Sequence, residues 1–453
     1  MAEQMKLNDS KAIRWGALGI VAFTMMAAYY VNDVVAPLKT MLESELAWSS
    51  SEFGFFTGAY SFLNVFLLML IWGGLILDRF GIRFTGKLAT ILMVVGTALE
   101  YYAMTALAGD MTLLFGMKSG VFVASAGYSV FGVGAEVAGI TVTKIIAKWF
   151  KGKELATAMG VQVALARIGS QAGYAAAIPL ARAFSLSTPV VLGLVLLVGG
   201  LIAFFAFSVM DKKLDKQLAD EAVATGTEDE EEKFSFKDVK NILTNPGFWL
   251  IALLCVLFYS CVFPFQKFAS ELMISKYGID ENVAGFFAGL PALGALILTP
   301  IFGGFIDKKG KSASIMMLGA AMLIGVHFVY AIPAIHYWLV AIVLMIILGI
   351  AFSLVPSAMW PAVAKIFPVS QLGTAYALIF FIQNIGLWGI PTLIGYVLDS
   401  YCKSEVGDVV VYDYTLPMCI FTGIAVLSLI VAIMLKSADK KYGYGLEEAN
   451  IKK

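Results

Sequence analysis

The stretch GGLILDRFGIR (residues 73–83) closes an apolar segment with a cluster of charged residues. A second stretch, GGFIDKKGK (residues 303–311), ends a later apolar segment in the same way. Three positions recur with a constant offset of 229 residues: Gly74, Asp78 and Gly81 correspond to Gly303, Asp307 and Gly310. Repetition at one fixed offset indicates that the chain consists of two structurally related halves.

The composition around these stretches is that of a membrane protein. The chain has 453 residues, of which 60% are hydrophobic and only 14% are charged, and its mean hydropathy is +0.84. A soluble protein carries roughly 25% charged residues. The 32 basic and 32 acidic residues cancel, so no basic surface for nucleic acid is expected. The lipid bilayer is the expected environment.

Uncharged stretches of sufficient length predict the membrane spans, because a hydrocarbon core about 30 Å thick needs ~20 helical residues. We predict an all-α membrane protein with twelve transmembrane helices, at residues 13–39, 51–77, 84–107, 118–147, 154–182, 186–210, 246–275, 282–306, 312–333, 336–364, 371–398 and 414–436. These runs are continuously apolar, unlike the alternating segments of about ten residues that form a membrane β-barrel.

The distribution of basic residues predicts the orientation of the helices. With the N-terminus inside, 25 of the 32 Lys and Arg residues lie in cytoplasmic segments, six lie outside, and Arg167 falls within a span. Basic residues accumulate on the cytoplasmic side of membrane proteins. Both termini of this multi-pass integral protein are therefore expected in the cytoplasm.

A charged segment divides the chain into two predicted six-helix bundles, residues 1–210 and residues 244–453. The segment between them, residues 211–243, contains an acidic run at 228–232. The central part of this segment is too poor in hydrophobic residues to order itself by burying apolar surface. We expect a cytoplasmic acidic linker between the bundles and a short cytoplasmic tail after the last helix.

The two repeated stretches resemble the loop motif of the major facilitator superfamily, Gly-x-x-x-Asp-Arg/Lys-x-Gly-x-Arg/Lys. The resemblance implies the major facilitator fold, with two pseudo-symmetric six-helix bundles. In this fold Gly74 would let a neighbouring helix approach, and Asp78 and Arg79 would pair with helix ends when the protein faces outward. The gating residues implied by the motif are Gly74, Asp78, Arg79, Gly81, Arg83, Asp307, Lys308 and Gly310.

Four longer stretches are similar to the branch of this superfamily that contains the lysosomal dipeptide uniporter. They are VFGVGAEVAGIT (130–141), AKWFKGKELATAMGVQVALARIGS (147–170), MWPAVAKIFPVSQLGTAYA (359–377) and FIQNIG (381–386). Trp360, Gln383 and Asn384 match that branch residue by residue. The resemblance implies uniport of dipeptides, in the lysosomal membrane of a eukaryote or in the plasma (inner) membrane of a bacterium.

Two charged residues lie deep within predicted spans, where a charge costs at least ~2.5–3.5 kcal/mol and usually faces a cavity. Glu136 lies eight residues before Lys144, and Arg167 lies fourteen residues after Lys153, on consecutive antiparallel helices. By these positions along the predicted helices, Glu136 is the only carboxylate that lies deep within a span. The pair can bind the amine and the carboxylate of a zwitterion. Alternatively, it forms a permanent bridge that locks the two helices together.

Polar and aromatic residues on other spans complete the candidate substrate site, which also includes Tyr30, Tyr259, Gln266, Lys267, Trp360, Gln383 and Asn384. Lys267 alternatively extends its ammonium group to the outer membrane interface. Asp33, near the outer end of the first span, is either a gate or a surface residue. Glu136 and Asp33 are the candidates for proton coupling.

Enzyme motifs are missing from the sequence, which has no HExxH, no GxSxG and no Cys/His cluster. We therefore expect no catalytic residue, no metal and no other cofactor. We predict a monomeric alternating-access transporter for small zwitterions, first of all dipeptides, working by uniport or with a proton. Two alternatives remain: a transporter of small organic anions that uses Arg167 and Lys267 as the anion site, and a non-transporting membrane receptor.

Overall fold

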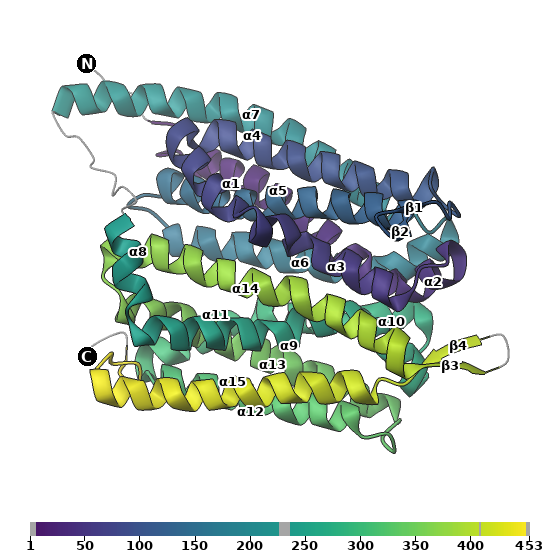
Figure 1. Ribbon diagram of the computed structural model, residues 1–453. Helices are drawn as coiled ribbons and strands as arrows, with labels where there is room; N and C mark the ends of the chain where they lie inside the picture. Colours follow the sequence, from purple (N-terminus) through teal and green to yellow (C-terminus); the bar gives the residue numbers. More distant parts are fainter. Residues whose placement is uncertain (1–5, 226–235, 407–408, 450–453) are drawn as a thin grey trace.

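The computed structural model describes residues 6–225, 236–406 and 409–449, which form two bundles of helices (Figure 1). The first bundle contains, in chain order, α1 (Lys11–Val34), η1 (Ala36–Leu38), α2 (Lys39–Leu46), α3 (Ser50–Phe66), α4 (Met69–Thr105), β1 (Leu113–Leu114), β2 (Met117–Lys118), α5 (Ser119–Trp149), α6 (Leu155–Ala183) and α7 (Thr188–Thr225). The second contains α8 (Phe236–Leu243), α9 (Pro246–Tyr277), α10 (Glu281–Ala288), α11 (Leu290–Lys309), α12 (Ser312–Ala331), α13 (Trp338–Ile366), α14 (Val369–Val397), η2 (Leu398–Cys402), β3 (Lys403–Val406), β4 (Val409–Tyr412) and α15 (Thr415–Tyr442).

Each of the twelve predicted spans corresponds to helical structure. The second span is formed by α3 and the first part of α4, and the eighth span is formed by α10 and α11. Ten helical stretches in the described part of the chain are long and apolar enough to cross a membrane. The predicted class, an all-α membrane protein, is confirmed.

Glycine interrupts or ends a helix at both copies of the repeated stretch. Within α4, Gly81 has φ 73° and ψ 175°, so the second and third spans join at this kink. Gly310 has φ 71° and follows the last residue of α11. Because a positive φ is strained for a residue that has a Cβ atom, the backbone at both positions favours glycine.

The two ends of the helical bundles differ in what they carry. Figure 1 marks both chain ends on the same side, together with α8, and we call this end the terminus side. The antiparallel hairpins β1–β2 and β3–β4 lie at the opposite end, which we call the far side (Figure 1). The bundles meet where α3 packs along α14 and where α6 packs against α10 and α11.

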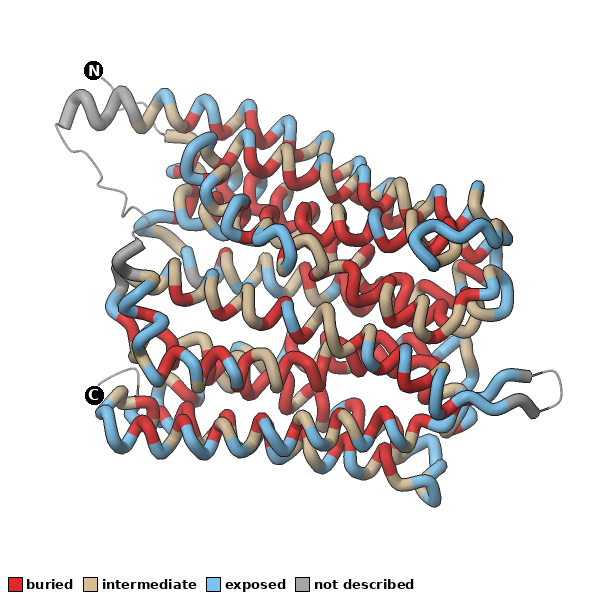
Figure 2. Tube along the Cα trace, viewed as in Figure 1, coloured by how far each residue is buried: buried red, intermediate tan, exposed pale blue. Residues whose placement is uncertain are grey.

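The burial pattern is that of a protein surrounded by lipid. Buried residues line the contacts between helices, and exposed residues occupy the outward surfaces (Figure 2). These surfaces are apolar: on α7, Val195 exposes 62% and Ile202 exposes 67% of its surface. Extended exposed apolar surface marks contact with a partner or a membrane. The chain is an integral membrane protein that crosses the bilayer several times.

Helix α7 continues to Thr225, beyond the predicted end of the sixth span at residue 210. Asp211 is fully buried, and its carboxylate lies 2.7 Å from the ammonium of Lys148 and accepts the indole N–H of Trp149 at 2.9 Å. These contacts hold the first residues of the proposed linker against α5. The acidic run at 228–232 lies outside the described residues.

Candidate functional site

Glu136 lies near the middle of α5, thirteen residues before the helix ends at Trp149. At 1.5 Å per residue this distance is about 20 Å. Its carboxylate accepts a hydrogen bond from the hydroxyl of Tyr60, on α3, at 3.1 Å. A carboxylate can accept about four hydrogen bonds, so Glu136 retains capacity for a ligand.

Arg167 lies near the middle of α6 and contacts aromatic rings from both bundles. Its guanidinium carbon is 4.9 Å from the ring centre of Phe352, on α13, and 5.7 Å from that of Tyr29, on α1. A cation within about 6 Å of a ring face is attracted to it. These contacts stabilise the charge without occupying the N–H donors at the edge of the guanidinium.

Glu136 and Arg167 do not form an ion pair with each other. Within the described residues, no nitrogen–oxygen distance of 4.0 Å or less joins the two side chains. The helices that carry them, α5 and α6, both pack against α1, and Arg167 lies over the ring of Tyr29 on that helix. The permanent bridge considered from the sequence is absent from this conformation, and both groups can bind a ligand.

An aromatic cluster of the second bundle faces Arg167. Tyr259 stacks on Phe263 with 5.4 Å between ring centres, and Phe352 meets both rings edge-on. Trp360 lies 6.4 Å from Tyr259 and 4.9 Å from Phe380. Two predicted site residues, Tyr259 and Trp360, therefore belong to the same cluster as the ring that covers Arg167.

Three predicted polar residues are buried in contacts of the second bundle. Gln383 accepts a hydrogen bond from a cysteine thiol at 3.4 Å. Asn384 donates to a carbonyl of its own helix at 3.0 Å, and Gln266 donates to a carbonyl of α10 at 3.4 Å. None of these hydrogen bonds involves Glu136 or Arg167, and the side-chain oxygen of Asn384 has no hydrogen-bond partner in the described structure.

Tyr30 is directed into the first bundle and away from Arg167. Its hydroxyl donates to the backbone carbonyl of Pro189 at 3.2 Å, and the residue is 4% exposed. The preceding residue, Tyr29, lies beside Arg167 instead. Consecutive helical residues point about 100° apart, and the sequence at the end of the first span does not show which of two tyrosines faces the centre.

Lys267 of α9 and Asp33 of α1 form an ion pair between the bundles on the far side. The Lys267 ammonium lies 3.0 Å from the Asp33 carboxylate and donates to the backbone carbonyl of Asn32 at 2.7 Å. The hydroxyl of Tyr128 donates to the same carbonyl at 2.7 Å. Lys267 and Asp33 are 9% and 8% exposed. Lys267 therefore does not extend to the membrane interface, and the pair closes the space between the bundles.

A second buried cluster of charges joins the bundles on the far side. The ammonium of Lys39, a residue that is 1% exposed, lies 2.6 Å from Glu43 of α2 and 2.6 Å from Glu271 of α9. Tyr412 donates to Glu43 at 3.1 Å, and Tyr414 donates to Glu271. Removing one partner of a buried ion pair is strongly destabilising, so this cluster holds the far side closed.

Glycines bring α3 and α14 into backbone contact on the far side. A Cβ on Gly54 would lie 2.4 Å from the carbonyl oxygen of Pro391 and 2.9 Å from Cα of Gly395. A Cβ on Gly58 would lie 2.5 Å from the carbonyl oxygen of Trp388. Small residues allow such close helix packing in membranes. The contact leaves no space for a ligand between these helices.

The first copy of the loop motif makes its contacts within the first bundle. Asp78 pairs with Lys144 of α5 at 3.3 Å. A Cβ on Gly74 would meet nothing within 4 Å, whereas a Cβ on Gly73 would lie 2.5 Å from the side chain of Val137. In this conformation the close helix approach expected at Gly74 is made by Gly73 instead.

The second copy of the motif packs against the C-terminal segment. Asp307 and Lys308 lie in the last turn of α11, just before Gly310. A Cβ on Gly310 would lie 2.4 Å from the backbone of Glu448. The gating roles of both copies stay predictions.

Glu100 of α4 is a second deep carboxylate, so Glu136 is not the only one. Glu100 is 0% exposed, and neither of its carboxylate oxygens has a hydrogen-bond partner in the described structure. It precedes Tyr101 and Tyr102, close to the end of the predicted third span. That sequence is typical of a membrane interface, so it does not by itself single out Glu100 as a site residue.

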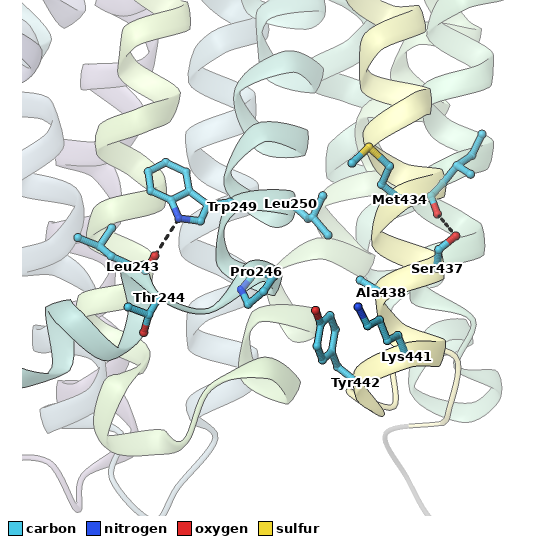
Figure 3. A pocket seen from close by; sticks show the side chains of 11 residues that line it. Leu243, Thr244, Pro246, Trp249, Leu250, Met434, Ser437, Ala438, Lys441 and Tyr442 are labelled. Atoms are coloured by element: carbon cyan, nitrogen blue, oxygen red, sulfur yellow. Dashed lines mark hydrogen bonds between the residues drawn. The ribbon is translucent and has the colours of Figure 1, made fainter.

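A separate groove of about 770 Å³ lies on the terminus side of the second bundle (Figure 3). Trp249 of α9 and Met434 and Tyr442 of α15 line it, and the indole N–H of Trp249 donates to the carbonyl of Leu243 at 2.9 Å. No predicted site residue lines this groove. It is distinct from the region around Glu136.

Comparison with known proteins connects this geometry to a family. The sequence model of the Major Facilitator Superfamily matches residues 18–390 and, in a second match, residues 267–446. The chain belongs to the major facilitator superfamily. Among relatives in this superfamily, it is 29% identical to the lysosomal dipeptide transporter MFSD1 of Homo sapiens over 395 residues, which cover 84% of this chain and 79% of that protein. It is 24% identical to the hexuronate transporter of Escherichia coli K12 over 425 residues, which cover 88% and 90%.

Solved structures of other transporters share the fold. The nucleoside transporter NupG superposes with a TM-score of 0.71 at 13% identity, covering 92% of this chain and 98% of that chain. A bacterial homolog of the human lysosomal transporter Spinster, in an inward-facing and unoccupied conformation, superposes with a TM-score of 0.66 at 12% identity, covering 98% and 99%. The major facilitator fold is thereby confirmed. The protein is a membrane transporter for a small molecule and not an enzyme.

Proposed function

We propose that this major facilitator transporter moves dipeptides, or similar small zwitterions, by alternating access. The observation that carries the proposal is the pair of half-buried, oppositely charged groups of Glu136 and Arg167, which lie near the middle of two helices of the first bundle and are not bonded to each other. The similarity to a lysosomal dipeptide transporter supports the same substrate class.

The geometry supports recognition of both ends of a dipeptide. Arg167 would hold the substrate carboxylate through two parallel hydrogen bonds, which its planar guanidinium favours. Glu136 would accept hydrogen bonds from the substrate ammonium, with the hydroxyl of Tyr60 holding the carboxylate in place. The aromatic cluster around Tyr259 and Trp360 would contact the substrate side chains. The backbone between the two charges is common to all dipeptides, so side-chain selectivity is expected to be broad.

The contacts between the bundles support a rocking movement. In this conformation the far side is closed by Lys267 with Asp33 and by the backbone contact of Gly54 with α14. Opening the far side requires these contacts to part while the terminus side closes around the same central site. The excess of basic residues on the terminus side supports a cytoplasmic location for both chain ends. On that basis the closed far side faces away from the cytoplasm, and the protein resides in a bacterial plasma membrane or a lysosomal membrane, acting as a monomer.

Transport of small organic anions is the second candidate, and the similarity to a hexuronate transporter favours it. In that mechanism Arg167 and Lys267 would bind the anion together. The ion pair of Lys267 with Asp33 opposes this arrangement, because the lysine charge is already compensated. Uptake into proteoliposomes of a labelled dipeptide and of a labelled monocarboxylate, measured side by side, separates the two candidates. Uptake of neither would favour a non-transporting receptor.

The substitution Arg167→Lys tests the carboxylate contact. It keeps the charge but loses the paired hydrogen bonds, so binding of a free-acid dipeptide should weaken by about 1–3 kcal/mol, the scale of a hydrogen bond to a charged group. A dipeptide amidated at its C-terminus lacks the carboxylate, so its binding should change much less on substitution. Ligand-dependent thermal stabilisation of the purified protein measures both. Arg182→Lys, on the same helix but exposed, is the matched control.

Glu136→Gln tests the other end of the substrate. This variant should weaken the binding of a free dipeptide and leave the binding of an N-acetylated dipeptide nearly unchanged, because the acetylated ligand has no ammonium group. The two variants should therefore show opposite ligand preferences. Equal losses for the free and the blocked ligand in both variants would refute the assignment of Glu136 and Arg167 to the substrate ends.

A further inference from the structure

Glu100 is packed against α5, next to a cluster of polar groups from α1, α5 and α9. On α5, a Cβ on Gly127 would lie 3.1 Å from the backbone nitrogen of Glu100, so the helices touch at this level. The next residue of α5, Tyr128, donates its hydroxyl to the carbonyl of Asn32 on α1, and Lys267 of α9 donates to the same carbonyl and pairs with Asp33 of α1. Lys267 is the cation of this cluster.

The positive charge of Lys267 is already compensated by another carboxylate. The ammonium of Lys267 lies 3.0 Å from Asp33 and donates to the carbonyl of Asn32. The Lys267–Asp33 pair is neutral, so an ionised Glu100 would add an uncompensated negative charge in a fully buried place. Neither oxygen of Glu100 has a hydrogen-bond partner in the described structure. A buried carboxyl group without partners is far less costly as the neutral acid than as the anion.

We propose that Glu100 is a proton-binding site, and that the far side closes only when this site is occupied. In the closed conformation the proton stays on the carboxyl group, enclosed by α5 and by the Lys267–Asp33 pair. When the bundles part on the far side, α9 withdraws Lys267 and water reaches Glu100. The O–H bond of the acid then breaks, and its proton passes to far-side water. Closure requires the reverse step.

This inference rests on the alternating-access movement of the proposed function, but not on the identity of the substrate. It assigns the proton to a residue other than Glu136 and Asp33. Glu136 remains available for the substrate, and Asp33 remains a partner of Lys267. The proposal makes the far-side pH a regulator of the conformational equilibrium.

Distances between spin labels on the far side test the proposal without any substrate. Labels on cysteines replacing Ser185 and His336, which are exposed far-side residues of the two bundles, report opening by double electron–electron resonance, with the exposed Cys419 replaced by serine. The purified protein in nanodiscs is measured from about pH 5 to about pH 9. Because one proton is linked to closure, the open-to-closed ratio should rise by up to tenfold per pH unit.

Three variants locate the proton. Glu100→Gln imitates the neutral acid and should be closed and nearly independent of pH, whereas the matched control Glu45→Gln, at an exposed carboxyl group of α2, should keep the wild-type slope. Glu100→Asp keeps a titratable group and should retain a pH dependence if the glutamine variant fails to fold. A wild-type distance distribution that does not change with pH would overturn the proposal. So would a full wild-type slope in Glu100→Gln. Failure of the dipeptide-binding test would leave these results unaffected.

Discussion

Substitution of Gly54 by alanine is expected to shift the transporter from the far-side-closed conformation toward the open one. The new methyl group would lie 2.4 Å from the carbonyl oxygen of Pro391 and 2.9 Å from Cα of Gly395. Ordinary van der Waals contact begins at 3.4 Å. Helices α3 and α14 therefore have to separate by about 1 Å, because close-packed atoms cannot be compressed by that amount.

The magnitude follows from the atoms involved. Both atoms that the methyl group meets belong to the backbone, so no side-chain rotation can relieve the overlap. Adding a methylene-sized group to a well-packed contact costs about 1–3 kcal/mol. The open conformation, in which the helices have parted, does not bear this cost. The equilibrium should therefore shift toward the open form by about 5–150-fold.

The spin-label pair at positions 185 and 336 measures this shift directly, as a larger population of long distances. Gly389→Ala on α14 is the matched control, because a Cβ at Gly389 would meet nothing within 4 Å. Both substitutions replace glycine by alanine within a helix, so the gain in helix propensity, about 1 kcal/mol, is common to both. The distance distribution of Gly389→Ala should match that of the wild type.

The opposite result would be informative. If Gly54→Ala leaves the distance distribution unchanged, the backbone contact between α3 and α14 does not limit opening. If both alanine variants open equally, the effect comes from helix stiffness and not from steric overlap. Either result would refute the role that we assign to the glycine contact.

Two further predictions concern the terminus side. Asp211→Ala should lower stability by about 3 kcal/mol, the low end for breaking a buried ion pair. Asp215→Ala, at a side chain that is 42% exposed, should lower stability by less than about 1 kcal/mol. Thermal unfolding in detergent compares the stability of these two variants. The second prediction concerns Glu154. The hydrogen bond that Arg14 donates to its carboxylate lowers the pKa of Glu154 below its ordinary value of 4.5. The contribution of this hydrogen bond to stability is therefore fully present above pH 4.5, and it is lost as the pH falls through the lower pKa that Glu154 has in the folded protein. Hydrogen exchange at residues 6–10, corrected for intrinsic rates, should accelerate at that low pH, and in Glu154→Gln it should be fast throughout. Equal exchange in both proteins at neutral pH would contradict this account.

The helices could be predicted from the sequence because the bilayer imposes a length on every apolar run. The repeated glycines were equally informative, since Gly81 and Gly310 both adopt a positive φ. The end of α7 was not predictable in this way. Asp211 looks like the end of a span in the sequence, but the buried contacts that it makes with α5 continue the helix.

The candidate site was predictable only where a residue is unusual for its surroundings. Glu136 and Arg167 are charges within apolar spans, so composition alone singled them out. Phe352 covers Arg167, yet a phenylalanine in an apolar span carries no signal of function. The sequence around Glu100, with two tyrosines near a predicted helix end, does not indicate that this residue is buried. Its burial depends on how α5 and α9 pack against α4, which is tertiary information.

The aromatic contacts of Arg167 have a consequence for turnover. A carrier that works without a counter-substrate has to return across the membrane empty once in every cycle, with its binding charge unneutralised. In this protein the guanidinium lies against Tyr29 and Phe352, from opposite halves of the molecule, and each ring is worth up to about 2 kcal/mol when desolvated. The rings replace part of the stabilisation that a bound carboxylate would provide, and so lower the barrier for the unloaded carrier. Net flux should accordingly approach the exchange rate, with little acceleration by substrate on the opposite side.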